Sequence, residues 1–78
     1  MSSRPRALRL LAEALALPES ELPADVRIGS IDQWDSLAHA RILLAIEEVL
    51  GTQLTAADAA TVESLDTIEA LLSRSGKV

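Results

Sequence analysis

The feature that most constrains the fold is the apolar periodicity of residues 37–50, the longest such segment in the chain. Apolar side chains recur there at three- and four-residue spacing, the period of an α-helix with a buried face. One row contains Ile42, Leu43, Ile46, Val49 and Leu50, with His39 at its edge, and a narrower row contains Leu37, Ala40 and Leu44. Two apolar rows on one helix predict that one row packs in a core and the other meets something else. Asp35 or Ser36 is expected to cap this helix at its start, and Gly51 to end it.

Two other segments have the same period, and a short third one has helix signals. The apolar positions of the first two are Ala7, Leu8, Leu11, Ala12, Leu15 and Ala16, and then Leu65, Ile68, Leu71 and Leu72. We expect Ser2 or Ser3 to cap the first helix, which should end near Leu17 because Pro18 disfavours helical geometry before it. Ser64 is expected to cap the last helix. Thr55 is expected to cap a short helix over residues 56–60.

Residues 18–33 form a long connection punctuated by Pro18, Pro23, Gly29 and Ser30. A helical turn is expected within residues 19–25. The apolar side chains spread along this connection, each of which could reach a core, are Leu22, Val26, Ile28 and Ile31. A connection of this length without regular structure is unusual in a compact domain and often has a function.

Together these segments predict an all-α fold, a small bundle of three main helices plus one short helix, with a long loop between helices one and two. Residues 1–78 are expected to form one domain, with frayed ends at about 1–3 and 75–78. The chain has no cysteine, and Trp34 is its only aromatic residue although 49% of its residues are hydrophobic. The core must therefore be held by aliphatic packing, without disulfides or thiolate metal sites.

Charge is distributed unevenly along the chain. Between residues 10 and 73, twelve acidic residues face only Arg27 and Arg41, so this part has a net charge of 2 − 12 = −10. Such a surface argues against binding nucleic acid and suits a basic protein partner, although it also has the simpler role of keeping the protein soluble. No apolar run is long enough to span a membrane, and no secretory signal is apparent, so we expect a cytoplasmic protein without membrane contact.

Ser36 and His39 are the residues from which an enzyme hypothesis would start, because three-residue spacing on a helix lets two side chains approach. A serine hydrolase also needs an oxyanion hole and an orienting acid, and the chain has no Gly-x-Ser-x-Gly motif. Glu47 and Glu48 are helix neighbours that point about 100° apart, so they cannot share a metal. We therefore expect no catalytic residue and no metal site. The serine is instead suited to modification by another protein.

Asp35-Ser36-Leu37 at the head of an apolar helix that ends Ile46-Glu47-Glu48-Val49-Leu50-Gly51 resembles the acyl carrier proteins of the discrete, stand-alone type. The resemblance covers nearly the whole chain, including the long loop before the serine and the short third helix. It implies that a separate phosphopantetheinyl transferase, using Mg²⁺, attaches 4′-phosphopantetheine from coenzyme A to Ser36. Acyl or aminoacyl groups would then be carried as thioesters on the thiol of that arm. A carrier of this kind is not itself an enzyme.

The resemblance also implies roles for the neighbours of Ser36. Asp35 would help to hold the metal during transfer, although a helix cap alone would explain an acid there. Leu37 would be a partly exposed contact for the transferase, with core burial as the alternative. Trp34 stands where many fatty-acid carriers have a small residue, and its indole is expected to pack under the loop with its N–H donated to a backbone carbonyl.

The expected partner surface comprises Ile31, Trp34, Leu37, Ala40, Arg41, Leu44, Glu47, Glu48 and Ala57. Fatty-acid carriers typically have acids on this face, whereas here Ala38, His39 and Arg41 occupy it. This departure favours a specialised biosynthetic pathway over general fatty-acid synthesis. Its enzymes would include a loading ligase and an acyltransferase or synthase. A monomer is expected, since a dimer would cover this surface. The alternative function is a small helical interaction module without a prosthetic group, which would dock a partner helix on Leu37, Ala40 and Leu44.

Overall fold

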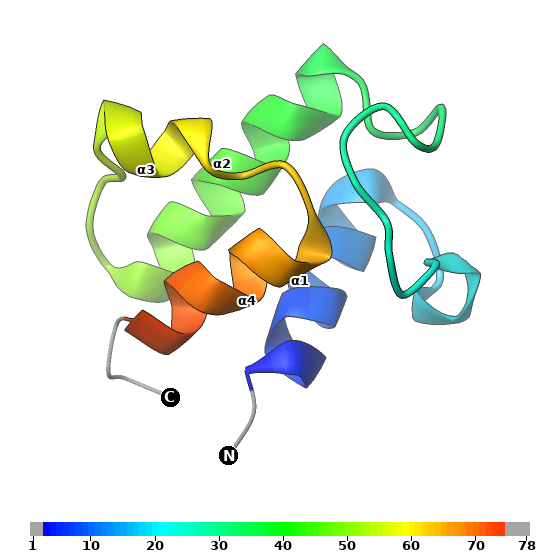
Figure 1. The fold of residues 1–78 in the computed structure, drawn as a ribbon, viewed down its shortest axis with the longest axis horizontal. Helices are drawn as coiled ribbons and strands as arrows, with labels where there is room; N and C mark the ends of the chain where they lie inside the picture. The colour runs from blue at the N-terminus through cyan, green and yellow to red at the C-terminus, as the bar shows by residue number, and fades with distance from the viewer. Residues whose placement is uncertain (1–2, 75–78) are drawn as a thin grey trace.

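The computed structural model describes residues 3–74 and is all-helical (Figure 1). Its elements are α1 (Arg4–Leu15), a 3₁₀ turn η1 (Glu19–Glu21), α2 (Ser36–Leu50), α3 (Ala56–Ala60) and α4 (Leu65–Arg74). Within the described range, extended backbone pairs at one isolated bridge, between Arg27 and Ser64. The predicted all-α bundle of three main helices and one short helix is confirmed. The ends expected to fray at residues 1–2 and 75–78 lie outside the described residues.

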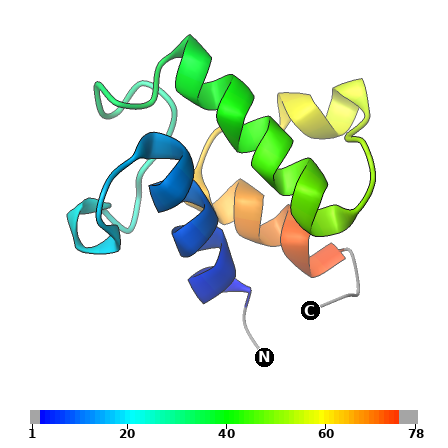
Figure 2. The same cartoon turned by 180° about the vertical axis from the view of Figure 1, so that it is seen from behind.

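The helices α1, α2 and α4 pack against one another (Figures 1 and 2). A mostly aliphatic core lies between them. Its least exposed large side chains are Leu11, Trp34, Ile42, Ile46, Ile68 and Leu72. All four predicted core positions of the last helix are buried. The stripe predicted on α2 is narrower than expected, because Ile42 and Ile46 are buried whereas Val49 is 38% exposed. None of the helices between residues 3 and 74 combines the length and apolar character that crossing a bilayer requires.

The start and the end of α1 differ from their predictions. The helix ends at Leu15, two residues before the expected position, because Ala16 adopts a left-handed conformation with φ 58°. The N–H of Leu17 then bonds to the carbonyl of Ala12 at 3.0 Å, which closes the helix end. Ser3 precedes the helix without donating or accepting a side-chain cap bond. It is buried and accepts a hydrogen bond from Ser73 Oγ at 3.0 Å, so the expectation that residue 3 frays is wrong.

The remaining helix boundaries follow the sequence signals. Thr55 Oγ1 accepts from the N–H of Asp58 at 3.0 Å, and Ser64 Oγ accepts from the N–H of Thr67 at 3.2 Å. Gly51 ends α2 with φ 74°, in the left-handed region that favours glycine. These three predicted boundaries are confirmed, and they fix the turns on both sides of α3.

The long connection between α1 and α2 is attached to the rest of the molecule through Val26. Its side chain is buried, and its carbonyl accepts from the N–H of Leu65 at 3.2 Å, while the N–H of Ile28 donates to the carbonyl of Glu63 at 2.8 Å. The predicted helical turn is confirmed as η1. Of the four apolar side chains that could reach a core, Ile28 is 44% exposed and does not. Backbone bonds hold the connection at that point.

Arg4 ties α1 to α4 and to the long connection. Its guanidinium donates to the carboxylates of Asp66 and Glu69 and, at 2.9 Å, to the carbonyl of Ala24. The hydrogen bond to Asp66 is the main reason why the pKa of Arg4 lies above its usual value. This residue therefore joins three segments that are far apart in the sequence.

Candidate functional site

Ser36 is the first residue of α2, and its neighbour Asp35 makes the helix cap. Asp35 is extended, its Oδ1 accepts from the N–H of Ala38 at 2.9 Å, and its carbonyl accepts from the N–H of His39 at 2.8 Å. Of the two cap candidates, Asp35 is therefore the one used. The hydroxyl of Ser36 is exposed and makes no hydrogen bond within residues 3–74. A rigid helix start thus presents a serine with a free hydroxyl to solvent.

Trp34 and His39 form a pair directly beneath this helix start. Trp34 is 2% exposed, and its indole Nε1 donates a hydrogen bond to His39 Nδ1 at 3.2 Å. The ring centroids are 6.3 Å apart, with 26° between the ring planes. The indole is buried as predicted, but its N–H partner is an imidazole and not a backbone carbonyl. The prediction that Trp34 belongs to the partner surface is wrong, because its side chain is inaccessible.

The pair also bears on the enzyme hypothesis. His39 is directed to the indole, and within the described residues no hydrogen bond joins it to Ser36. Nδ1 can accept the indole N–H only while that nitrogen carries no proton. His39 therefore accepts the indole N–H and supports the turn before Ser36. The five-residue spacing between Trp34 and His39, across a helix start, is the sequence signal that could have predicted this contact.

The second apolar row of α2 is exposed. Leu37 and Leu44 are 63% and 62% exposed, and Ala40 between them is also exposed. The prediction that α2 has one core face and one outer apolar face is confirmed, as is the exposure of Leu37. Ala38, expected on the outer face, is instead 6% exposed, because it lies one turn before Ile42 on the buried side.

Some of the other residues predicted for the partner surface are exposed, and others make contacts within the fold. Arg41, Glu48 and, on α3, Ala57 are exposed, while Ile31 is half-buried against the core. Glu47 is half-buried, and its Oε2 accepts from the N–H of Leu54 at 3.0 Å. One oxygen of this carboxylate therefore holds the turn between α2 and α3. Only the other oxygen is available to a partner.

The backbone at the start of α2 could bind an anion. The first N–H groups of a helix attract anions, and α2 is long enough for its dipole to add to this effect. The N–H groups of Ser36 and Leu37 make no hydrogen bond within residues 3–74, whereas that of Ala38 is used by Asp35. Across that same part of the chain, no three His, Asp or Glu side chains lie close enough together to hold a metal ion.

Comparison of the chain with models of protein families, with curated proteins and with solved structures gave no match.

Proposed function

We propose that this protein is an acyl carrier protein that is modified at Ser36 with 4′-phosphopantetheine. It would present its cargo to the enzymes of a specialised biosynthetic pathway. The observation that carries the proposal is the free, exposed hydroxyl of Ser36 at the first position of α2, held there by the Asp35 cap. The resemblance of residues 35–37 and 46–51 to the acyl carrier proteins gives the kind of modification. The all-helical fold with its long connection before α2 is compatible with that class.

In this proposal the chain's own residues position and present the attachment point. The Ser36 oxygen would form the new bond to the phosphorus of coenzyme A that bears the pantetheine. The bond from that phosphorus to adenosine bisphosphate would break, and the hydroxyl proton would pass to a base of the transferase. The free N–H groups at the start of α2 would face the resulting phosphodiester. By the same resemblance, Asp35 would help to hold the Mg²⁺ that the transferase uses. The prosthetic group supplies a thiol, which this cysteine-free chain lacks.

The exposed row on α2 supports a contact with partner enzymes. Leu37 and Leu44 would enter apolar recesses on a partner, with Arg41 and Glu48 at the edge of the contact. An apolar centre with charged neighbours is the usual composition of such a contact. The cargo would be an acyl or aminoacyl group loaded by a separate ligase.

Mass spectrometry of the intact chain tests the proposal. After incubation with coenzyme A, Mg²⁺ and a broad-specificity transferase, we expect the mass to rise by about 340 Da, the mass of one phosphopantetheinyl group. Ser36→Ala should abolish the increase, whereas Ser30→Ala, at an exposed serine of the long connection, should leave it intact. An unmodified wild-type chain, in a reaction that modifies a known carrier, would refute the proposal.

A helical interaction module is the second candidate, favoured by the same exposed row on α2. In that case Leu44→Asp would abolish capture of a partner while Ser36→Ala would leave it intact. A carrier predicts that both the mass shift and the partner reactions depend on Ser36. The two candidates are therefore separated by one pair of variants.

A further inference from the structure

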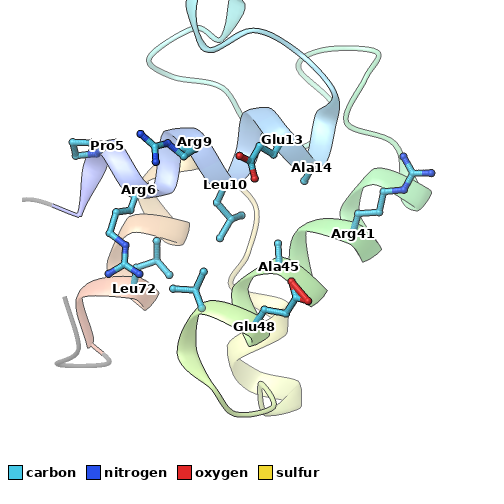
Figure 3. A pocket seen from close by; sticks show the side chains of 11 residues that line it. Pro5, Arg6, Arg9, Leu10, Glu13, Ala14, Arg41, Ala45, Glu48 and Leu72 are labelled. Atoms are coloured by element: carbon cyan, nitrogen blue, oxygen red, sulfur yellow. The ribbon is translucent and has the colours of Figure 1, made fainter.

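A groove of about 560 Å³ lies between α1 and α2, with Leu72 of α4 at one end (Figure 3). Its apolar lining comprises Leu10, Ala14, Ala45, Val49 and Leu72. Leu10 and Ala45 point towards each other from the two helices (Figure 3). Alanine side chains leave this space open where leucines would fill it. The opening explains why Val49, expected in the core, is 38% exposed.

Three arginines surround this apolar lining. Arg6 and Arg9 lie one turn apart on α1, and Arg41 lies at the other end of the groove on α2 (Figure 3). None of the three has an ion-pair partner within residues 3–74, whereas Arg4 and Arg74 are both paired. An unpaired guanidinium beside apolar surface can donate to an anion.

The charges of the groove are unequal at its two ends. Glu13 and Glu48 also line it, so three arginines and two glutamates give a net charge of +1 in a chain whose net charge is −5. Glu13 lies on α1 one turn after Arg9, between Arg9 and Arg41 (Figure 3). The α1 side of the groove therefore has two arginines, Arg6 and Arg9, against one glutamate, Glu13.

We propose that this groove binds a soluble, single-chain anionic amphiphile, of the class of medium-chain carboxylates. The carboxylate would lie against Arg6 and Arg9, and the alkyl chain would cover Leu10, Ala45 and Val49. Burial of the chain provides the apolar contribution to binding, and the guanidinium groups orient the head. The site does not use Ser36, so it is independent of the proposed modification.

The size of the groove favours a small molecule over a partner helix as its occupant. Its volume falls in the range of small-molecule sites, about 300–1,000 Å³. From Arg41 to Val49 the helix rises about 12 Å. An extended alkyl chain of about eight to ten carbons has that length, given C–C bonds of about 1.5 Å. A partner helix, about 10 Å wide with its side chains, would need a broader and shallower surface.

Titration with sodium decanoate below its micelle concentration tests the proposal. The Ser36→Ala chain is used, so that no covalent arm can form, and binding is followed by calorimetry and by amide chemical shifts. We expect saturable binding, with the largest shift changes in α1 and in the second half of α2. The combined change Arg6→Gln and Arg9→Gln should weaken binding about tenfold, as expected for the loss of charge-assisted hydrogen bonds.

Matched variants separate the charge effect from the apolar effect. Arg27→Gln removes an exposed arginine outside the groove and should leave binding unchanged. Ala45→Phe should abolish binding by filling the space, and Glu13→Gln should tighten it a few-fold by removing a carboxylate beside the tail. If Ala45→Phe fails to fold, the variants at the exposed arginines still test the proposal.

Four outcomes would overturn the proposal. One is the absence of saturable binding, and another is equally tight binding of decyltrimethylammonium, which has the same tail and the opposite charge. The third is a concentration-dependent dimer in sedimentation that the paired arginine change disrupts, since the occupant would then be a second copy. The fourth is that decanoate changes the amide chemical shifts of Leu37 and Leu44 alone. Because the Ser36→Ala chain is used throughout, failure here leaves the carrier proposal intact, and failure of that proposal leaves this site intact.

Discussion

The contact between α1 and α4 and the outer face of α2 are built from similar aliphatic residues, but they have different surroundings. Between α1 and α4, side chains such as Leu11 and Ile68 are fully buried, and Arg4 joins the two helices at the edge of the contact. On the outer face of α2, Leu37 and Leu44 are more than half exposed in the part of the chain that the structure describes. The difference separates residues that hold the fold from residues available for contacts outside it.

The strongest test of this comparison is a pair of truncations on α2. Ile42→Ala should destabilise the fold by about 2–5 kcal/mol, since it leaves a cavity at a fully buried position. Leu44→Ala, two residues away and 62% exposed, should change the free energy of unfolding by less than about 0.5 kcal/mol. Urea unfolding followed by circular dichroism measures both. Equal losses would mean that the outer face is covered in solution.

The pair of Trp34 and His39 predicts the next largest effect. His39→Leu leaves the buried indole N–H without its acceptor, which should cost about 1–3 kcal/mol. Trp34→Phe removes the donor, so in the Trp34→Phe background the same His39 change should cost less. A double-mutant cycle in urea measures the coupling. A coupling energy near zero would show that the hydrogen bond contributes nothing to the stability of the turn before Ser36.

The sequence was sufficient to predict both ends of α2 and the starts of α3 and α4, because each of these boundaries has a local chemical signal. The oxygens at Asp35, Thr55 and Ser64 and the glycine at position 51 all act where they were expected. The early end of α1 was not predictable in this way, because Ala16 adopts a left-handed conformation that alanine rarely takes. Ala16 itself is exposed, and the local cost is offset by the hydrogen bonds from the N–H groups of Ala16 and Leu17 to the carbonyls of Glu13 and Ala12, which the sequence pattern does not show.

For the candidate site, the sequence predicted correctly which side chains of the outer face of α2 are exposed, but it did not predict the hydrogen-bond partner of Trp34. The exposed face of α2 follows from periodicity, so Leu37 and Leu44 were placed correctly. The indole of Trp34 has several possible acceptors nearby, and only the three-dimensional geometry selects His39. The groove between α1 and α2 was missed because it depends on how two helices separated by twenty residues pack together.

A smaller effect on stability is expected for Arg4, which lies at the edge of the buried contact between α1 and α4. Arg4→Gln should lower the free energy of unfolding by up to about 1 kcal/mol, because its side chain is 34% exposed and solvent weakens its ion pairs. The loss should shrink as salt is raised from about 0.05 M to 1 M, since salt screens the same pairs in the wild-type chain. Arg9→Gln is the control, because Arg9 is an exposed arginine of the same helix that has no ion pair within residues 3–74. A salt-independent loss would assign the role of Arg4 to packing alone.

The smallest effect is expected at Ser36 itself. Ser36→Ala should change the free energy of unfolding by less than about 0.5 kcal/mol, because the hydroxyl makes no hydrogen bond within the described residues and alanine is a good first-turn residue. Asp35→Ala removes the cap beside it and should cost about 1 kcal/mol, which shows that the measurement detects changes at this helix start. Thermal unfolding of the three chains provides the comparison. If Ser36→Ala cost as much as Asp35→Ala, the serine would be part of the cap, and its hydroxyl would not be free for modification.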